Sequence, residues 1–146
     1  MRMAWYSAFM VALLLAGPGC VSAQQTRPDP PRVGDRLAGT NWQAVSINGQ
    51  PVANPAEMTI DFLPGEQVRG QAGCNRYVGP YGTRDDRITL GILRQSRLNC
   101  DPAQMAAQKQ LIDLLHGATR AEVVAGTLVL SGRHGEEIHF VRRAAS

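Results

Sequence analysis

Gly70-Gln71-Ala72-Gly73-Cys74-Asn75-Arg76-Tyr77 is the stretch of this 146-residue chain that says most about its fold. It contains one of three cysteines, and the other two are Cys20 and Cys100. What these cysteines do depends on the compartment, because disulfides persist in oxidising environments outside the cytosol. The beginning of the chain therefore decides how residues 70–77 are interpreted.

The first 23 residues have the pattern of a signal peptide. Arg2 gives a positive start, and residues 4–16 form an uncharged, mainly apolar run, shorter than the ~20 residues that span a bilayer. Val21-Ser22-Ala23 then places small residues before Gln24, as signal peptidase requires. We predict cleavage between Ala23 and Gln24, and export of the remainder.

Cys20 allows a second interpretation of this segment. A bacterial lipoprotein signal ends in a small-residue box and a cysteine that is acylated after cleavage. Gly19 suits the position before Cys20, whereas Gly17 and Pro18 depart from the usual box. Soluble export and a lipid on Cys20 both stay open, and the lipid would attach the protein to a membrane that it does not span.

The mature chain divides into a linker and one domain. Residues 24–35 contain three prolines and no apolar periodicity, which predicts an extended, proline-rich linker. Residues 36–143 have the length of a single domain. Charges of both signs are mixed and the formal net charge is +3, so nothing indicates a nucleic-acid partner.

Cys74 and Cys100 remain as an even pair once Cys20 is removed or acylated. In an exported protein the simplest interpretation is a disulfide between them. The chain-entropy model gives such a bond a stabilisation on the order of 3 kcal/mol. The alternatives are two buried free thiols, or a reactive Cys74 activated by a histidine.

Strand patterns precede Cys100. Residues 42–47 have the composition of a strand. They are followed by Asn48-Gly49, which favours a type I′ hairpin turn. Residues 58–62 alternate in polarity, which predicts a half-buried strand that returns over residues 67–72. Its inward residues would be Met58, Ile60 and Phe62. Residues 79–82 (Gly-Pro-Tyr-Gly) predict a turn. Residues 87–93 predict another strand, with Ile88, Leu90 and Ile92 on one face.

After Cys100 the pattern becomes helical. Asp101-Pro102-Ala103-Gln104 predicts a helix over residues 101–116, with Asp101 as N-cap and Gln104 completing a capping box. Its apolar stripe would comprise Met105, Leu111, Ile112, Leu114 and Leu115, and Gly117 would end it.

The chain ends in strand patterns again. Residues 122–125, 127–130 and 136–141 predict three short strands, whose inward residues would be Leu128, Leu130, Ile138 and Phe140. The whole pattern indicates a mostly β protein, an antiparallel sandwich or barrel with one α-helix.

A family resemblance appears when these residues are taken in order. Thr40-Asn41-Trp42, Ile47-Asn48-Gly49, residues 70–77 and Ser96-Arg97-Leu98-Asn99-Cys100 resemble the META domain family, also called HslJ-like proteins. The resemblance covers residues 36–143. It implies an antiparallel β-barrel-like domain and a bacterial envelope location, in the periplasm or at the outer membrane, often as a lipoprotein. It also implies a loose link to stress response and antibiotic tolerance.

The resemblance implies structural roles for its motif residues, which are Trp42, Gly70, Gly73, Cys74, Asn75, Tyr77 and Cys100. Gly73 and Gly79 would serve backbone geometry, Asn75 a turn, and Trp42 and Tyr77 packing. The chain departs from the family pattern at Ser96, where Thr is frequent, and at Gln108, where Glu is frequent.

No residue set indicates catalysis or a metal centre. His116 stands apart, and only His134 and His139 are spaced closely enough to be partners. No carboxylate pattern there matches a known site, although Glu136 and Glu137 lie between them, so a surface loop is the interpretation. Asp85-Asp86 resembles a solvated turn. We therefore predict a protein that is not an enzyme and that has no catalytic residue, metal or cofactor.

Two classes of function remain. We expect a non-enzymatic envelope protein whose barrel mouth, sheet face or edge strand binds an envelope protein or a small ligand. Basic side chains near Cys74 would either favour an anionic surface or ligand or serve solubility alone, and these are Arg69, Arg76, Arg84, Arg87, Arg94 and Arg97. The alternative is a small envelope hydrolase or thiol enzyme that uses Cys74 or a histidine.

Overall fold

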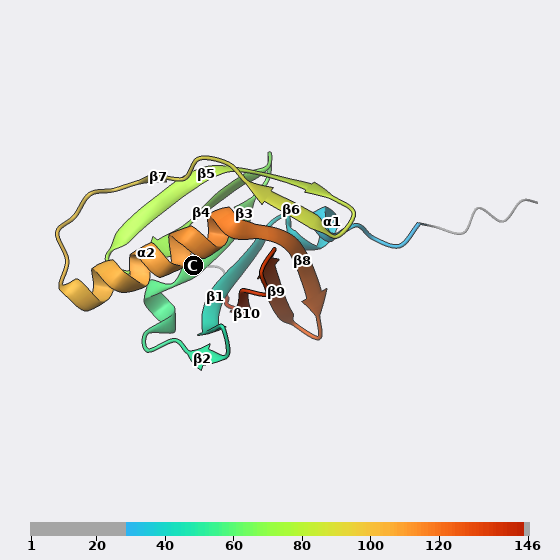
Figure 1. Cartoon of the computed structure of the whole chain (residues 1–146). Coiled ribbons are helices and arrows are strands. Elements are labelled where there is room, and N and C mark those ends of the chain that lie inside the picture. Colours follow the sequence, from blue (N-terminus) through green and yellow to red (C-terminus); the bar gives the residue numbers. More distant parts are fainter. Residues whose placement is uncertain (1–28, 145–146) are drawn as a thin grey trace, which may run out of the picture.

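The structure, a computed structural model, describes residues 29–144 (Figure 1). Eight antiparallel strands of these residues form a closed barrel, because β10 pairs with β1. Their spatial order is β1 (Thr40–Ile47), β3 (Thr59–Leu63), β4 (Gln67–Ala72), β5 (Asn75–Arg84), β6 (Arg87–Leu90), β8 (Ala118–Val124), β9 (Thr127–Gly132) and β10 (Glu137–Arg142). The predicted mostly β, barrel-like fold is confirmed.

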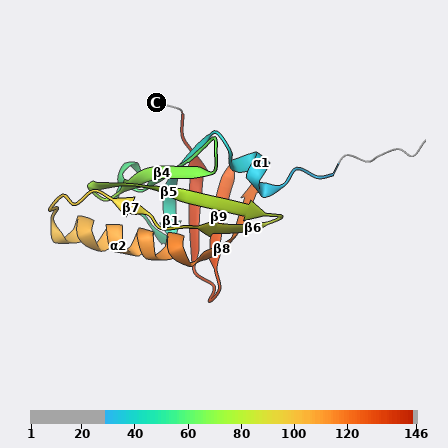
Figure 2. The same ribbon diagram turned by 90° about the horizontal axis from the view of Figure 1, so that it is seen from above.

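The remaining elements lie outside the eight barrel strands. They are the main helix α2 (Pro102–Gly117) and four short elements: α1 (Val33–Leu37), β2 (Gln50–Pro51), the 3-10 turn η1 (Pro55–Glu57) and β7 (Arg94–Gln95). Figure 1 shows α2 along one side of the barrel and α1 near the opposite end. In Figure 2, seen from above, the barrel strands β4, β5 and β6 run across β1 and β9 of the opposite wall. None of the helices in residues 29–144 is long and apolar enough to cross a bilayer.

The tight turns follow from residues that adopt positive φ. Asn48 and Gly49 have φ angles of 48° and 77°, as the predicted type I′ turn requires. Ala125 and Gly126 repeat the pattern, with φ angles of 49° and 80°, between β8 and β9. These turns fix the register of the hairpins that they join.

The core is filled from both the strands and α2. Trp42, Phe62 and Phe140 are fully buried, as are the predicted inward residues Leu128, Leu130 and Ile138. On α2, Leu111, Ile112 and Leu115 are buried against the barrel, whereas Met105 is 40% exposed. The predicted apolar stripe is therefore correct for the second half of the helix and wrong at Met105, which precedes the part that packs on the barrel.

The start of α2 is as predicted, except for the capping box. The Asp101 carboxylate accepts hydrogen bonds from the N–H groups of Ala103 and Gln104, both at 3.0 Å. The Gln104 side chain does not turn back to the N-cap. Its Nε2 donates to Glu57 Oε2 at 3.3 Å and thus ties the helix to η1.

The prediction of a half-buried β3 is wrong, because its polar positions are buried too. Thr59 and Asp61 are each only 5% exposed. Thr59 Oγ1 accepts the Gln71 N–H at 3.0 Å, and the Asp61 carboxylate pairs with Arg69 and Arg143. These partners cover the outer face of β3, so burial does not follow the alternating pattern.

The strand predicted over residues 87–93 is interrupted by a β-bulge after Leu90, so the prediction is wrong beyond that residue. Tyr81 pairs with Leu90 and Val78 pairs with Arg94, so three steps along β5 face four steps along the partner strand. The extra residue reverses the facing of the side chains after it. Ile92 is therefore 84% exposed instead of inward, while Leu93 is 5% exposed.

The turn predicted at residues 79–82 is absent from the structure, because these residues continue β5. Gly79 is needed there for proximity: a Cβ would lie 2.6 Å from the Ile92 carbonyl oxygen and 2.8 Å from Leu93 Cδ2. The glycine thus lets the bulged chain pass close to β5.

The end of the predicted linker over residues 24–35 is also corrected. Residues 33–35 are helical, in α1, and not extended. Val33 and Leu37 are buried, and the Val33 N–H donates to the Asp85 carbonyl at 3.3 Å. Burial of these two apolar side chains draws the end of the linker onto the barrel.

We expect Gly79→Ala to destabilise the protein by about 1–3 kcal/mol, because the new methyl group meets the backbone of the bulge. For a domain of this size the melting temperature should fall by roughly 4 °C per kcal/mol. Thermal unfolding followed by circular dichroism measures the effect.

Gly82→Ala is the matched control in the same strand, because a Cβ there has no atom within 4 Å and the φ angle is not positive. It should be neutral or slightly stabilising. Equal melting temperatures for the two variants would contradict the close approach at Gly79.

Candidate functional site

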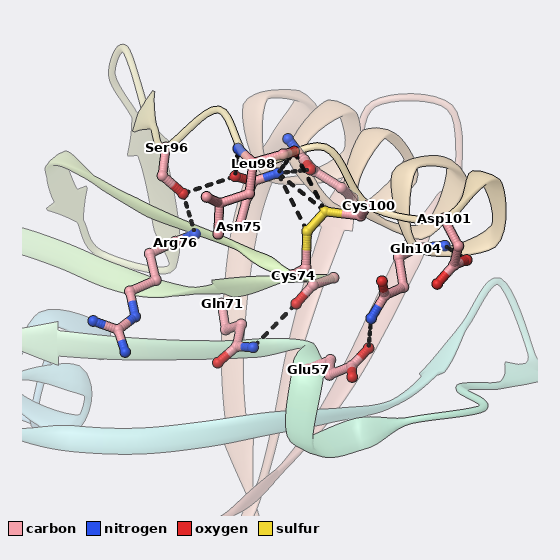
Figure 3. The surroundings of a disulfide bond; sticks show 12 residues. Glu57, Gln71, Cys74, Asn75, Arg76, Ser96, Leu98, Cys100, Asp101 and Gln104 are labelled. Carbon is pink, nitrogen blue, oxygen red and sulfur yellow. Dashed lines mark hydrogen bonds between the residues drawn. A yellow bond between two sulfur atoms is a disulfide. The ribbon is translucent and has the colours of Figure 1, made fainter.

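A disulfide joins the start of β5 to the start of α2. Cys74 and Cys100 are bonded in the structure, with Cα atoms 6.2 Å apart and a sequence separation of 26 (Figure 3). Cys74 lies in the turn between β4 and β5, and Cys100 directly precedes the N-cap of α2. The bond therefore closes a loop that contains β5, β6 and β7.

Asn75 is a hydrogen-bonding centre beside this disulfide. Its Oδ1 accepts from the Ser96 hydroxyl and the Leu98 N–H, both at 2.8 Å. Its Nδ2 donates to the Leu98 carbonyl at 3.2 Å and to Gln108 Oε1 at 2.8 Å. Asn75 is 1% exposed and lies in β5, so the turn role expected for it is corrected to one of bridging. We call Asn75, the disulfide and these partners the Asn75 node.

The two departures from the family pattern both fall in the Asn75 node. The Ser96 hydroxyl donates to Asn75 and also accepts the Arg76 N–H at 3.0 Å, so serine supplies both bonds. Gln108 accepts from Asn75 through Oε1 and donates to Gln95 Oε1 at 2.7 Å. A carboxylate at this position would keep the acceptor and lose the donor.

The other motif residues have structural surroundings. Gly73 has a φ angle of 59°, and a Cβ there would meet the Gln104 carbonyl at 2.6 Å. The Tyr77 ring lies across Gly70, and its hydroxyl donates to the Thr59 carbonyl at 2.7 Å. Trp42 is fully buried, and its indole N–H donates to the Thr40 hydroxyl at 2.6 Å.

Strand register gathers arginines on the outer face of β4, β5 and β7. Asp61, Arg69, Val78 and Arg94 are successive cross-strand partners in one row. In the next row Gln71 pairs with Arg76. These residues line a groove of about 660 Å³, to which Arg143 contributes from beyond β10. We call it the arginine groove.

Asp61 neutralises part of this positive charge. Its Oδ1 accepts from Arg143 Nη2 at 2.6 Å, and its Oδ2 lies 3.5 Å from Arg69 Nε. Burial, together with the negative charge of Asp61, raises the pKa of Tyr77 far above its ordinary value. Tyr77, which lines the arginine groove, is therefore a neutral hydrogen-bond donor. Within residues 29–144, the Arg76 and Arg94 guanidinium groups have no acidic partner.

The predicted set of six arginines is thus divided by the fold. Arg69, Arg76 and Arg94 line the groove, and Arg97 lines an adjoining hollow with Leu98 and Met105. Arg84 and Arg87 pair with each other at the far hairpin and lie outside the groove. Sequence reasoning missed Asp61 and Arg143, which lie 82 residues apart and meet only in the closed barrel.

The histidines are not gathered into one centre. His139 Nε2 lies 3.1 Å from Glu137 Oε2, and the backbone N–H of His134 donates to Glu136 Oε2 at 3.0 Å. Hydrogen bonds from the backbone N–H groups of Glu136 and His134 lower the pKa of the Glu136 carboxyl. Among the described residues, no group of three or more His, Cys, Asp or Glu side chains is placed to hold a metal ion. The predicted signal peptide, Cys20, Ala23 and Gln24 lie outside residues 29–144.

These features define the class of protein: a small antiparallel β-barrel with one lateral helix, linked to the barrel by a disulfide at a buried asparagine. The chain belongs to the META domain family, whose model matches residues 35–145. The family resemblance noted in the sequence is therefore confirmed.

Solved structures support the fold. A protein from Burkholderia xenovorans, solved by NMR, has a TM-score of 0.66 and 21% identity, covering 88% of this chain and 99% of its own. A DUF4847 family protein from Bacteroides vulgatus ATCC 8482, solved by crystallography, has a TM-score of 0.60 and 14% identity, covering 78% and 99%. Comparison with curated proteins gave no match. At these identities the likenesses concern the fold alone.

We expect Cys74 and Cys100 to give no thiol signal in Cys20→Ser protein that has been unfolded without a reductant. The variant that also carries Cys74→Ala and Cys100→Ala should lose on the order of 3 kcal/mol of stability. It should melt roughly 10 °C lower. Thiol titration and thermal unfolding measure the two effects.

Cys20→Ser alone is the control for both readouts. Two thiols titrating in the unreduced, unfolded control would show that the bond is not formed. A triple variant that melts with the control would show that the bond does not stabilise the fold.

Proposed function

We propose that this protein is an exported, non-enzymatic binding module that takes an anionic ligand in the arginine groove. The observation that carries the proposal is the pair Arg76 and Arg94, which line one groove without an acidic partner in the described residues. Guanidinium groups bind carboxylates and phosphates through two parallel hydrogen bonds, so the pair suits an oxyanion.

The charges of the groove support an anion over a cation. Four arginines line it, against the single carboxylate of Asp61. Arg143 and Arg69 are engaged with that carboxylate, which leaves the positive charge of Arg76 and Arg94 uncompensated. A concave surface of one sign concentrates counter-ions and raises the rate at which an anionic ligand binds.

The setting of this binding is proposed from the sequence. The signal-peptide pattern of residues 1–23 supports export to the bacterial periplasm or outer membrane, with a lipid on Cys20 as the alternative to soluble release. The partner would then be an envelope protein or a small ligand. A role in stress response or antibiotic tolerance is what the family resemblance implies.

The alternative of a small hydrolase or thiol enzyme has less support. A thiol mechanism needs Cys74 as a free thiolate, whereas the Cys74 sulfur is bonded to Cys100. His116 and His134 line a separate hollow with Arg87 and Glu136, and no nucleophile with a paired base is evident in the described residues. We therefore favour binding.

The test uses inorganic pyrophosphate as an anionic probe, with binding followed by NMR. Addition of pyrophosphate should shift the amide signals of Arg76, Val78 and Arg94. The double variant Arg76→Ala/Arg94→Ala should bind at least tenfold more weakly, because each charge-assisted hydrogen bond contributes about 1.5–3 kcal/mol. Both side chains are exposed, so the fold should survive.

Arg84→Ala/Arg87→Ala is the matched control, since it also removes two exposed arginines, and both lie outside the groove. It should bind pyrophosphate as the parent does. If the two double variants weaken binding equally, net charge is responsible and the groove proposal fails.

A further inference from the structure

Large apolar side chains are exposed beside the arginine groove. Five large hydrophobic residues of the described part are exposed, and four of them lie on or next to the segment from Gly91 to Asn99, which we call the strap. These four are Val78 (44%), Ile92 (84%), Leu98 (59%) and Met105 (40%). The fifth, Val124, ends β8 elsewhere on the barrel.

The bulge in the strap turns Ile92 and Arg94 to the same outer side of the sheet. A regular continuation of β6 would turn Ile92 and Arg94 into the barrel. The extra residue between Leu90 and Arg94 turns both outward, where Arg94 pairs with Val78 and Ile92 passes close to Gly79 of β5. An apolar and a basic side chain are thus presented side by side on one surface, as bulges near functional sites often re-aim side chains.

The same surface is almost free of acidic groups. The arginines of this surface are Arg69, Arg76, Arg94 and Arg97, and the segments that carry them, residues 67–84 and 87–100, contain no Asp or Glu. The hollow formed by the strap and α2 is lined without any carboxylate, and Asp61, the one carboxylate of the groove, is only 5% exposed. Arginines interspersed with apolar side chains, without acids, are typical of surfaces that bind anionic lipid.

We propose that the strap face docks on the surface of a bilayer that contains anionic phospholipid. Headgroup phosphates occupy the arginine groove between Arg76 and Arg94, and Ile92 and Leu98 enter the boundary between headgroups and acyl chains. The inference rests on the proposed function, since the lipid phosphate is the anion of the groove. A soluble anion would use the same arginines and would leave Ile92 and Leu98 in water.

The Asn75 node gives this surface a fixed shape. Ser96 and Leu98 are bonded to Asn75, and Arg94 and Gln95 are paired with β5. The strap is therefore held at both its middle and its end, so little conformational freedom is lost when it binds.

Co-sedimentation with vesicles tests the proposal. The protein is purified from the envelope as the Cys20→Ala variant, so that a lipid on Cys20 does not contribute. It should bind vesicles of equal parts phosphatidylglycerol and phosphatidylcholine at least tenfold more tightly than vesicles of phosphatidylcholine alone. Added salt should weaken this binding, because the charges are exposed.

Two variants in this background separate the lipid from a free anion. Ile92→Ser/Leu98→Ser should bind vesicles at least tenfold more weakly and pyrophosphate as the parent does. Arg76→Ala/Arg94→Ala should lose both ligands. Val124→Ser is the control, because it removes an exposed apolar side chain elsewhere and should change neither binding.

Each outcome decides between the claims. Parent protein that binds pyrophosphate but not anionic vesicles overturns the docking inference and leaves the groove proposal standing. Full vesicle binding by Ile92→Ser/Leu98→Ser also overturns the inference. Parent protein that binds neither pyrophosphate nor anionic vesicles would overturn the proposed function as well.

Discussion

The buried amide of Asn75 is the constraint on which the rest of the structure depends. Its Oδ1 and Nδ2 make four hydrogen bonds with oxygen and nitrogen partners, which are Ser96, both backbone groups of Leu98, and Gln108. Its Nδ2 also donates to the sulfurs of Cys74 and Cys100, at 3.7 and 3.6 Å. A buried amide left without partners would cost several kcal/mol, so the strap and α2 must lie where they satisfy it. The neighbouring disulfide makes this arrangement less costly in chain entropy, because the strap lies within the loop that it closes. Since the strap carries Arg94, the node also sets one wall of the arginine groove.

Local patterns predicted most of the elements, and long-range contacts explain the failures. Asn48-Gly49 and Asp101-Pro102 act within a few residues, so the β1–β2 hairpin and the start of α2 could be predicted. The bulge after Leu90 depends on the approach of the chain to Gly79 in another strand, which periodicity does not reveal. Burial of Asp61 depends on an arginine 82 residues away.

The candidate site was predictable in composition and not in arrangement. The sequence singles out six arginines near Cys74, but only the register shows that Arg69, Arg76 and Arg94 share a face while Arg84 and Arg87 do not. Arg143 was missed because it meets the others only when β10 closes on β1. The bulge then adds Ile92 to the same surface, and this combination of charge and exposed apolar area distinguishes a lipid surface from a soluble anion as the proposed partner.

The central claim is that the Asn75 node, held by the disulfide, fixes the strap, and hydrogen exchange of the Leu98 amide tests it most directly. Leu98 is 59% exposed, yet its N–H donates to Asn75 Oδ1 at 2.8 Å. We expect this amide to exchange far more slowly than in an unstructured peptide while the disulfide is intact, and to lose most of that protection on reduction. Exchange at the unprotected rate in the oxidised protein, or protection that reduction leaves unchanged, would contradict the account.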